Sequence, residues 1–389
     1  MPETRLERGC KMILLHTSDW HIGMPVGNSN YREDQLFFVD ELIRVIREEH
    51  VDAVILAGDV FDSGKVSSEA IDIWNQAATK VCQDCDIPMI VIAGNHDSAD
   101  RLAVCSELLK KSRLYICGRV TNPVEPVLLD DGKVAVWPLP FFQSDAVRAK
   151  WPEHCEEAVN QTQAMQIVLG NIRERMGDYA RNIVVSHALV SDAELSDSDR
   201  SARIGGASAV PVSVFDGFDY TALGHIHKPQ RMNDHVRYSG SPMAYSFGAE
   251  ESHEKGFVLY DTVSGEQRFV SIRQLHPHRT VTASYEEIPA LQKKLENCWL
   301  NLSVTDKPAG PELYSEMRER FPYLAFLRGR FTGTGEMTGA ITGEELMKMS
   351  DTDILKQFLS DTESLISPTE RQLAWFEKSM LAEEEEDLQ

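Results

Sequence analysis

The feature that most constrains the fold of this chain is a repeated pattern in which a short apolar run is followed by Asp, Asn or His. The pattern occurs at five places, where the polar residues are Asp19 and His21, Asp59, Asn95 and His96, His187, and His225 and His227. Amphipathic helical patterns over 33–49 and about 67–85 separate the first three runs. Strands that alternate with helices predict an α/β fold, which places its sites at the carboxyl ends of the strands.

The rest of the first 275 residues continues this pattern more weakly. We expect further strands at 114–117, 133–137, 182–186, 220–223, 236–239, 256–260 and 267–273, and a helix over about 155–176. The last three of these strands are predicted to be antiparallel. The segment 191–209 is rich in Ser, Asp, Gly and Ala and is predicted to be a loop.

Changes in pattern along the chain predict a division into domains. Residues 1–11 are polar and charged and are expected to be disordered, and 12–275 form the large α/β domain. The order strand, helix, strand, helix, strand over 279–331 predicts a small separate α+β domain, with boundaries at 276–335.

The C-terminal region, 336–389, has helical patterns only. One helix is predicted to begin at the capping box Ser367-Pro368-Thr369-Glu370, which has proline at the first helical position. A short helix with one apolar face has little core of its own, so it either packs on the neighbouring domain or docks on a partner. The acidic run 383–387 is predicted to be a solvated tail.

The charge balance limits how the chain can meet nucleic acid. With 39 basic and 61 acidic side chains the formal net charge is −22. A protein that coats nucleic acid is usually basic, because contacts with phosphate drive its affinity. Either the substrate is not a polyanion, or metal ions and a partner supply the positive charge.

Cysteine usage and hydropathy indicate the compartment. The seven cysteines are odd in number and scattered, which favours a reducing compartment over a disulfide framework. Cys82-x-x-Cys85 is the pattern of a redox pair, but it stands at the end of a predicted helix, so we interpret it as two ordinary thiols. We find no run of membrane-spanning length and no signal peptide, and we expect a cytoplasmic protein without a membrane partner.

The residue types at the five places point to metal ions. A single histidine at the end of a strand is usually a satisfied polar group, but five successive runs ending in Asp, Asn or His are hard to explain in that way. Carboxylate, amide and imidazole groups without thiolates suit Mn²⁺, Fe²⁺ or Zn²⁺. They are too many for one ion, and two ions about 3.5–4 Å apart clamp an in-line displacement at phosphorus. The sequence therefore predicts a two-metal phosphoesterase.

These motifs resemble those of a known family, the calcineurin-like metallophosphoesterases. The likeness rests on Asp-x-His at 19–21, Gly-Asp-x-x-Asp at 58–62, Gly-Asn-His-Asp at 94–97, His187, and Gly-His-x-His at 224–227, and it extends over residues 12 to about 272. Finer features resemble the SbcD branch of Mre-type nucleases. They are the segments His-Thr-Ser-Asp-Trp-His-Ile-Gly at 16–23, Ala-Gly-Asn-His-Asp-Ser at 93–98 followed by Arg101-Leu102, and Tyr-Ser-Gly-Ser-Pro at 238–242. The resemblance implies a sandwich of two sheets flanked by helices, with a small α+β capping domain and C-terminal helices.

The resemblance also implies roles for individual residues. One metal would be held by Asp19, His21, Asp59 and His227, and the other by Asp59, Asn95, His187 and His225. His96 would be the catalytic acid, protonating the leaving group without binding metal, because an imidazolium has its pKa near working pH. Asp62 would orient His96 through a hydrogen bond. Asp97 is interpreted as the N-cap of the next helix rather than as a support of the site.

The activity implied by the resemblance is that of a DNA nuclease with two divalent ions, foremost Mn²⁺. It comprises ATP-dependent 3′–5′ double-strand exonuclease and single-strand endonuclease activity, with cleavage of hairpins and blocked ends in replication, recombination and repair. The implied partners are an SbcC-like coiled-coil ATPase, bound by the C-terminal helices, and DNA. A homodimer would form through helices 33–49 and 67–85, as part of a heterotetramer with the ATPase. The complex would be associated with the nucleoid.

Two other interpretations remain open from the residues alone. A stand-alone phosphodiesterase or phosphatase for a small substrate would use the same site, and the acidic charge alone favours it. A metal-stabilised scaffold without activity is the third, although every position that matches a family ligand is filled. Contacts with DNA are expected, by position only, from Arg32, Lys65, Arg101 and the loop 191–209.

Overall fold

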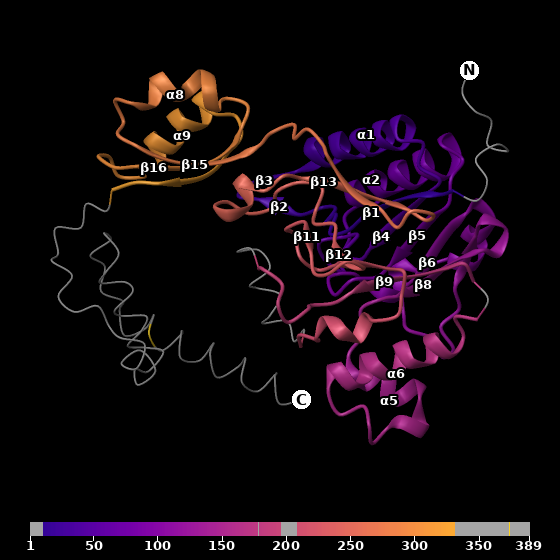
Figure 1. Ribbon diagram of the computed structural model, residues 1–389. Coiled ribbons are helices and arrows are strands. Elements are labelled where there is room, and N and C mark those ends of the chain that lie inside the picture. The colour runs from indigo at the N-terminus through magenta and orange to yellow at the C-terminus, as the bar shows by residue number, and fades with distance from the viewer. Residues whose placement is uncertain (1–10, 178, 196–207, 331–372, 374–389) are drawn as a thin grey trace, which may run out of the picture.

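The computed structural model of the protein describes residues 11–177, 179–195, 208–330 and 373. Expectations for residues 1–10, for most of the loop 191–209 and for nearly all of 336–389 lie outside the described residues. The large domain is a sandwich of two six-stranded sheets with helices on both outer faces, and a smaller α+β domain follows it (Figure 1).

The first sheet has the strand order β14-β13-β1-β4-β5-β6. Its strands are β1 Ile13–Thr17, β4 Ala53–Ala57, β5 Met89–Ile92, β6 Leu114–Cys117, β13 Gly256–Asp261 and β14 Gln267–Ser271. Strands β1, β4, β5 and β6 are parallel, whereas β13 runs antiparallel to both β1 and β14. The loops that follow β1, β4 and β5 therefore leave the sheet at the same edge.

The second sheet has the strand order β11-β12-β10-β9-β8-β7. Its strands are β7 Val127–Leu129, β8 Val134–Leu139, β9 Arg181–His187, β10 Tyr220–Gly224, β11 Gln230–Arg231 and β12 Val236–Tyr238. Strands β8, β9, β10 and β12 are parallel. The prediction that the strand near 236–239 is antiparallel was wrong for its pairing with β10, because a two-residue strand, β11, supplies the antiparallel neighbour.

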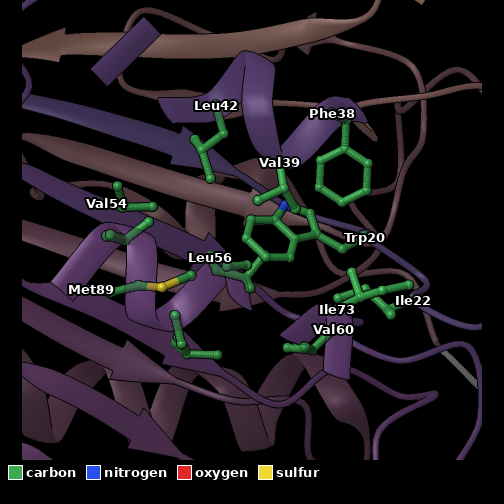
Figure 2. Packing of buried hydrophobic residues seen from close by; sticks show 14 of the residues in the cluster. Trp20, Ile22, Phe38, Val39, Leu42, Val54, Leu56, Val60, Ile73 and Met89 are labelled. Atoms are coloured by element: carbon green, nitrogen blue, oxygen red, sulfur yellow. The ribbon is translucent and has the colours of Figure 1, made fainter. Parts of the chain in front are cut away.

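The core has three layers. Between the sheets lie residues that alternate along the strands, such as Ile55 and Val185. The outer face of the first sheet is covered by α1 Arg32–Glu48 and α2 Ser68–Thr79, and Figure 2 shows Trp20 packed among Phe38, Leu56 and neighbouring apolar side chains. The second sheet is covered by α5 Ser144–Lys150 and α6 Gln161–Glu174.

The helices differ from the predicted ranges at their ends. Helix α6 begins at Gln161 rather than near 155, because Asn160 caps it through a capping box with Gln163. Helix α2 ends at Thr79 and continues as one π-helical turn, η1 Lys80–Asp84. The sequence analysis did not predict α5 or several short elements: β2 Pro25–Val26, β3 Ser29–Asn30, α3 Ala99–Leu102 and α4 Ser106–Leu109.

The small domain has the predicted order of elements. These are β15 His278–Ala283, α8 Ile288–Leu295, β16 Trp299–Val304, α9 Pro311–Arg320 and β17 Leu324–Arg328. Its three strands are parallel and share a core with both helices. It is joined to the beginning of α1, where Asp34 accepts hydrogen bonds from the amide of His276 and from the indole of Trp299.

The structure bears on the expectations about membrane-spanning segments and about the Cys82 and Cys85 thiols. No helix among the described residues is both long and apolar enough to cross a membrane. Cys82 and Cys85 are free thiols, and burial raises the pKa of both, that of Cys82 to about 11. A raised thiol pKa works against redox chemistry, which uses the thiolate.

Candidate metal centre

The predicted metal ligands all follow parallel strands and meet at one edge of the sandwich. Asp19 and His21 follow β1, Asp59 follows β4, Asn95 follows β5, His187 ends β9, and His225 and His227 follow β10. The loops are tied to one another through the main chain. The amide of Asp19 donates to Gly58 O at 3.0 Å, and that of His21 donates to Asp59 O at 3.0 Å.

Several of these ligands have an unusual backbone conformation. Asp19 (φ 53°), His21 (φ 39°), Asp59 (φ 51°) and His225 (φ 103°) all have positive φ. Non-glycine residues are held there at a cost of about 1–3 kcal/mol each, and such positions cluster at functional sites. The fold therefore maintains turns that aim these side chains inward rather than letting the strands end in relaxed loops.

Two glycines are required by the close approach of these loops. A Cβ atom on Gly94 would lie 2.1 Å from Asp59 Oδ1, and one on Gly224 would lie 1.9 Å from Ala57 O. No side chain can be accommodated at either distance. The glycines that precede Asn95 and His225 in the sequence motifs are therefore explained by packing of one loop on the next.

The first group of ligands surrounds His21 and His227, whose Nε2 atoms are 3.1 Å apart. His21 Nδ1 faces the Asp62 carboxylate at 3.6 Å, and His227 Nδ1 faces another carboxylate, that of Glu250, at 3.5 Å. With a proton on each Nδ1, the two Nε2 lone pairs point at each other and repel. Asp19 has a carboxylate oxygen in the same cluster, so a cation between these atoms resolves the repulsion.

The second group surrounds Asn95. Its Oδ1 lies 2.9 Å from His187 Nε2 and 2.9 Å from His225 Nδ1. His187 Nδ1 donates to Ala57 O at 2.9 Å, which orients the ring and leaves Nε2 facing the site. Asp59 belongs to both groups, because its Oδ2 lies 3.3 Å from His187 Nε2 and 3.7 Å from His21 Nε2.

These distances fit two bound ions that share Asp59. Ligand atoms around one ion with bonds of about 2.1 Å lie about 3.0–3.4 Å apart, which is close to the spacings in both groups. The donors are imidazole, carboxylate and amide groups, which suit divalent transition metals. The residues present therefore fit the metal pair that their types predicted.

The charge distribution follows from burial of Asp59. Only 2% of this residue is exposed, yet the histidines around it hold its pKa well below the ordinary value against the effect of burial. Burial also opposes the charged form of His187, but the Asp59 carboxylate outweighs it and raises the pKa of His187 to about 9. The centre of the site thus attracts positive charge.

Asp97 supports the site and does not cap a helix, so our interpretation from sequence was wrong. Its carboxylate accepts from the amides of Val60 (3.1 Å), Phe61 (2.9 Å) and Gly94 (2.9 Å). It thereby joins the loop of Asp59 to the loop of Asn95. Burial and the neighbouring Asp59 raise the pKa of Asp97 to about 6. The sequence could not show this, because a carboxylate before a helix is typical of an N-cap.

His96 and Asp62 are adjacent, but their contact differs from the predicted one. His96 Nδ1 donates to the main-chain carbonyl of Asp62 at 2.8 Å, while the Asp62 carboxylate faces His21 instead. The amide of Asp62 is held by Ile22 O, which turns its side chain toward the first loop. His96 is exposed, and its ring stands 4.8 Å from that of His21, measured between centroids.

Tyr245 is a second supporting residue that the sequence analysis missed. Its ring packs edge-on against the rings of His21 (5.4 Å) and His227 (5.7 Å), and its hydroxyl donates to Trp20 O. On its other side it contacts Tyr31, whose hydroxyl bonds to His278 of the small domain at 2.6 Å. An isolated tyrosine outside a strand-end motif gave no signal in the sequence.

Comparison with known proteins identifies the family. The calcineurin-like phosphoesterase profile matches residues 12–229, and the SbcD C-terminal profile (type 5 capsule protein repressor C-terminal domain) matches 274–363. The SbcD subunit of the nuclease SbcCD from Staphylococcus saprophyticus is 30% identical over 288 residues, which are 73% of this chain and 75% of that protein.

Solved structures align with about two thirds of the chain at low similarity. The protein TT1561 of Thermus thermophilus gives a TM-score of 0.38 at 12% identity, over 67% of this chain and 99% of that one. GAP50 of Plasmodium gives 0.41 at 14% identity, over 68% and 90%. The sequence matches, together with the two-sheet architecture and the ligand groups, carry the assignment. The chain belongs to the calcineurin-like phosphoesterases, metal-dependent phosphodiester hydrolases, and within them to the SbcD-type nucleases.

Proposed function

We propose that this chain is the DNA nuclease subunit of an SbcCD-type complex and hydrolyses phosphodiesters at the site described above. The observation that carries the proposal is the pair of ligand groups that share the buried carboxylate of Asp59. We assign Asp19, His21, Asp59 and His227 to one ion and Asp59, Asn95, His187 and His225 to the other. The ions, with Mn²⁺ the first candidate, would supply Lewis acidity and an activated water.

The protein's own residues orient the reaction. His96 is exposed beside the ligand groups, and its Nδ1–H is held by Asp62 O, so Nε2 is left to face the substrate. In its protonated form it donates to the leaving alkoxide or stabilises charge at the scissile phosphate. Asp62 positions this ring through its carbonyl, and Asp97 and Tyr245 hold the loops and ligand rings in place.

The proposed substrates are DNA ends, hairpins and single strands. The activities are ATP-dependent 3′–5′ double-strand exonuclease and single-strand endonuclease cleavage, used in replication, recombination and repair. The small domain, 276–335, would cap the site. Arg32, Lys65 and Arg101 would contact the phosphate backbone; Arg32 and Lys65 are exposed, and Arg101 donates to Gly64 O in the loop that follows Asp62.

The proposed assembly has two partners, an SbcC-like coiled-coil ATPase and a second copy of this chain. Residues 336–389 would bind the base of the coiled coil, a helix-in-groove contact. The homodimer would form through α1 and α2, the helices that follow the first and second motifs, where Ile71 of α2 is an apolar side chain that is 44% exposed. The resulting heterotetramer would act in the cytoplasm at the nucleoid.

The test is hydrolysis by the purified chain in Mn²⁺ on linear duplex DNA, hairpin DNA and bis-p-nitrophenyl phosphate. Each substrate is run with and without the ATPase partner and ATP, and His96→Ala serves as the control. Cleavage of duplex and hairpin that requires Mn²⁺ and rises with partner and ATP supports the proposal. Turnover of the small ester without DNA cleavage in any condition favours a stand-alone phosphodiesterase, the function to which the net charge of −22 points.

A further inference from the structure

A buried ion pair lies behind the first ligand group. Glu250 belongs to the short 3₁₀ helix η6 Ala249–Ser252, and Lys255 stands directly before β13. They are 1% and 3% exposed, and Lys255 Nζ lies 2.8 Å from Glu250 Oε2. Removing two charges from water is costly, and replacing such a pair by apolar side chains is often neutral or stabilising. The pair therefore calls for a reason other than stability.

The contacts of the pair are nearly complete. Lys255 Nζ donates to Glu250 Oε2, to Ser241 Oγ at 2.8 Å and to His227 O at 3.1 Å, so the three ammonium protons each have an acceptor. Glu250 accepts in addition from the hydroxyl of Ser246 at 2.7 Å and from the amide of Tyr245 at 3.2 Å. Such a network has one geometry and holds both side chains rigidly.

The network acts on His227 from two sides. Lys255 binds its main-chain carbonyl, and Glu250 Oε1 lies 3.5 Å from its Nδ1. The opposite ring nitrogen, Nε2, is 3.1 Å from His21 Nε2 in the first ligand group. A carboxylate behind a ligating imidazole fixes its tautomer and orientation and makes it a better ligand, and losing such a partner typically costs 10–100-fold in metal affinity.

We propose that Glu250 and Lys255 are positioning residues for the metal ion held by Asp19, His21, Asp59 and His227. Glu250 keeps the Nδ1–H tautomer of His227 and aims Nε2 at the ion, while Lys255 neutralises Glu250 and fixes the His227 main chain. The inference rests on the proposed two-metal function and deepens it. It assigns a role to two side chains that lie outside the strand-end motifs.

The experiment is a calorimetric titration of the full chain with Mn²⁺. The variants are Glu250→Gln and the double substitution Glu250→Gln with Lys255→Met. The double variant matters because the single one leaves a buried ammonium without its partner and is expected to be less stable. Glu41→Gln is the matched control, since Glu41 (3% exposed) is buried like Glu250 (1%) and its carboxylate is paired with Arg44 and Arg273 rather than with a ligand residue.

We expect the wild-type chain to bind two ions and both Glu250 variants to bind one of them about 10–100-fold more weakly. In the metal-free chain with ¹⁵N-labelled histidine, the His227 ring should change from a predominant Nδ1–H tautomer in the wild type to a mixture of tautomers in the Glu250 variants. The Glu41 variant should keep both affinities. A folded double variant with two wild-type affinities and an unchanged His227 tautomer would overturn the inference, whereas a wild-type chain that binds no metal would overturn the proposed function itself.

Discussion

At the scale of the residue, Asp59 and His96 have different surroundings. Asp59 is buried and lies between the two ligand groups, whereas His96 is exposed and bonded to a main-chain carbonyl. His96 also lies close enough to His21 and Asp59 for the three side chains to hold one metal ion, since their ligand atoms are all within 4.8 Å of one another. Ligand and acid therefore have to be separated by experiment.

We predict that substitutions of His96 and Asp59 differ in their effect on metal content. His96→Ala should retain both ions and lose nearly all turnover, because the acid is removed and the ligand groups are intact. Asp59→Ala should lose turnover and metal together, because the shared carboxylate is removed. Metal analysis after gel filtration in Mn²⁺ measures both. Equal loss of metal in the two variants would show that His96 is a ligand.

Asp97 gives a prediction about support of the site. An asparagine keeps its shape but has only one acceptor oxygen, so at least one of the amides of Val60, Phe61 and Gly94 loses its partner. We expect Asp97→Asn to lower the free energy of unfolding by about 1–3 kcal/mol and to reduce turnover. Asp100→Asn, which alters an exposed pair with Arg119, is the control and should change neither. An Asp97 variant with wild-type Tm and turnover would refute this role.

At the scale of the element, α1 joins the two domains. Its residue Glu41 accepts from Arg44 in the same helix at 2.8 Å and from Arg273, shortly before β15, at 2.7 Å. Burial favours the neutral acid, but the guanidinium groups of Arg44 and Arg273 outweigh it and lower the pKa of Glu41 to about 2. Asp34, near the beginning of α1, accepts hydrogen bonds from the amide of His276 and the indole of Trp299.

The sign of the pH effect follows from this lowered pKa. The folded-state pKa is below the ordinary value of 4.5, so the carboxylate contributes stability above about pH 5 and loses it as the pH falls toward 2. Glu41→Gln should lower the free energy of unfolding by about 1–2 kcal/mol at pH 7, because water screens the side chains of Arg273 (75% exposed) and Arg44 (36% exposed). Urea unfolding at pH 7, 5 and 4 should show that the difference in free energy of unfolding between the wild type and Glu41→Gln becomes smaller as the pH falls.

The matched control for this prediction is Glu48→Gln. Glu48 bonds the same Arg44 but is 59% exposed, and exposed pairs contribute about 0–1 kcal/mol. The control should show little change at any pH. A Glu41 effect that is constant from pH 7 to 4, or equal to that of Glu48, would contradict the role given to this carboxylate.

At the scale of the whole molecule, exposed apolar side chains give a test of the proposed homodimer. Ile71, on α2, is 44% exposed, and Val159, before α6 on the other outer face, is 68% exposed. If α1 and α2 form the dimer surface, Ile71→Asp should convert the dimer to a monomer in sedimentation experiments, because it buries an unpaired charge. Val159→Asp should leave the dimer intact, and the reverse outcome would move the surface to α6.

The C-terminal region carries the last prediction. Deleting 340–389 should abolish binding of the ATPase partner and leave basal hydrolysis of bis-p-nitrophenyl phosphate unchanged, because every residue of the proposed site precedes 276. Co-purification and an ester assay on the same preparation measure the two properties. Loss of both together would show that the region also maintains the large domain.

The sequence by itself determined the alternation of strands and helices and the five places where polar side chains follow apolar runs. These are local properties: an apolar run predicts a buried strand, and parallel strands bring their ends to one edge. The strand predicted at 182–186 and the order strand, helix, strand, helix, strand predicted over 279–331 are therefore confirmed.

Only the tertiary structure decided how the site is supported. Asp97 accepts from the amides of Val60 and Phe61 in another loop, and Glu250 faces His227 from another loop. The His96 contact uses the carbonyl of Asp62 rather than its carboxylate. The docking of Trp299 on Asp34 also joins segments far apart in the sequence, and the pairing of β12 with β10 depends on how β11 folds back. Such contacts depend on where loops meet after the sheets have packed, and the pattern of side chains along one strand carries no information about that.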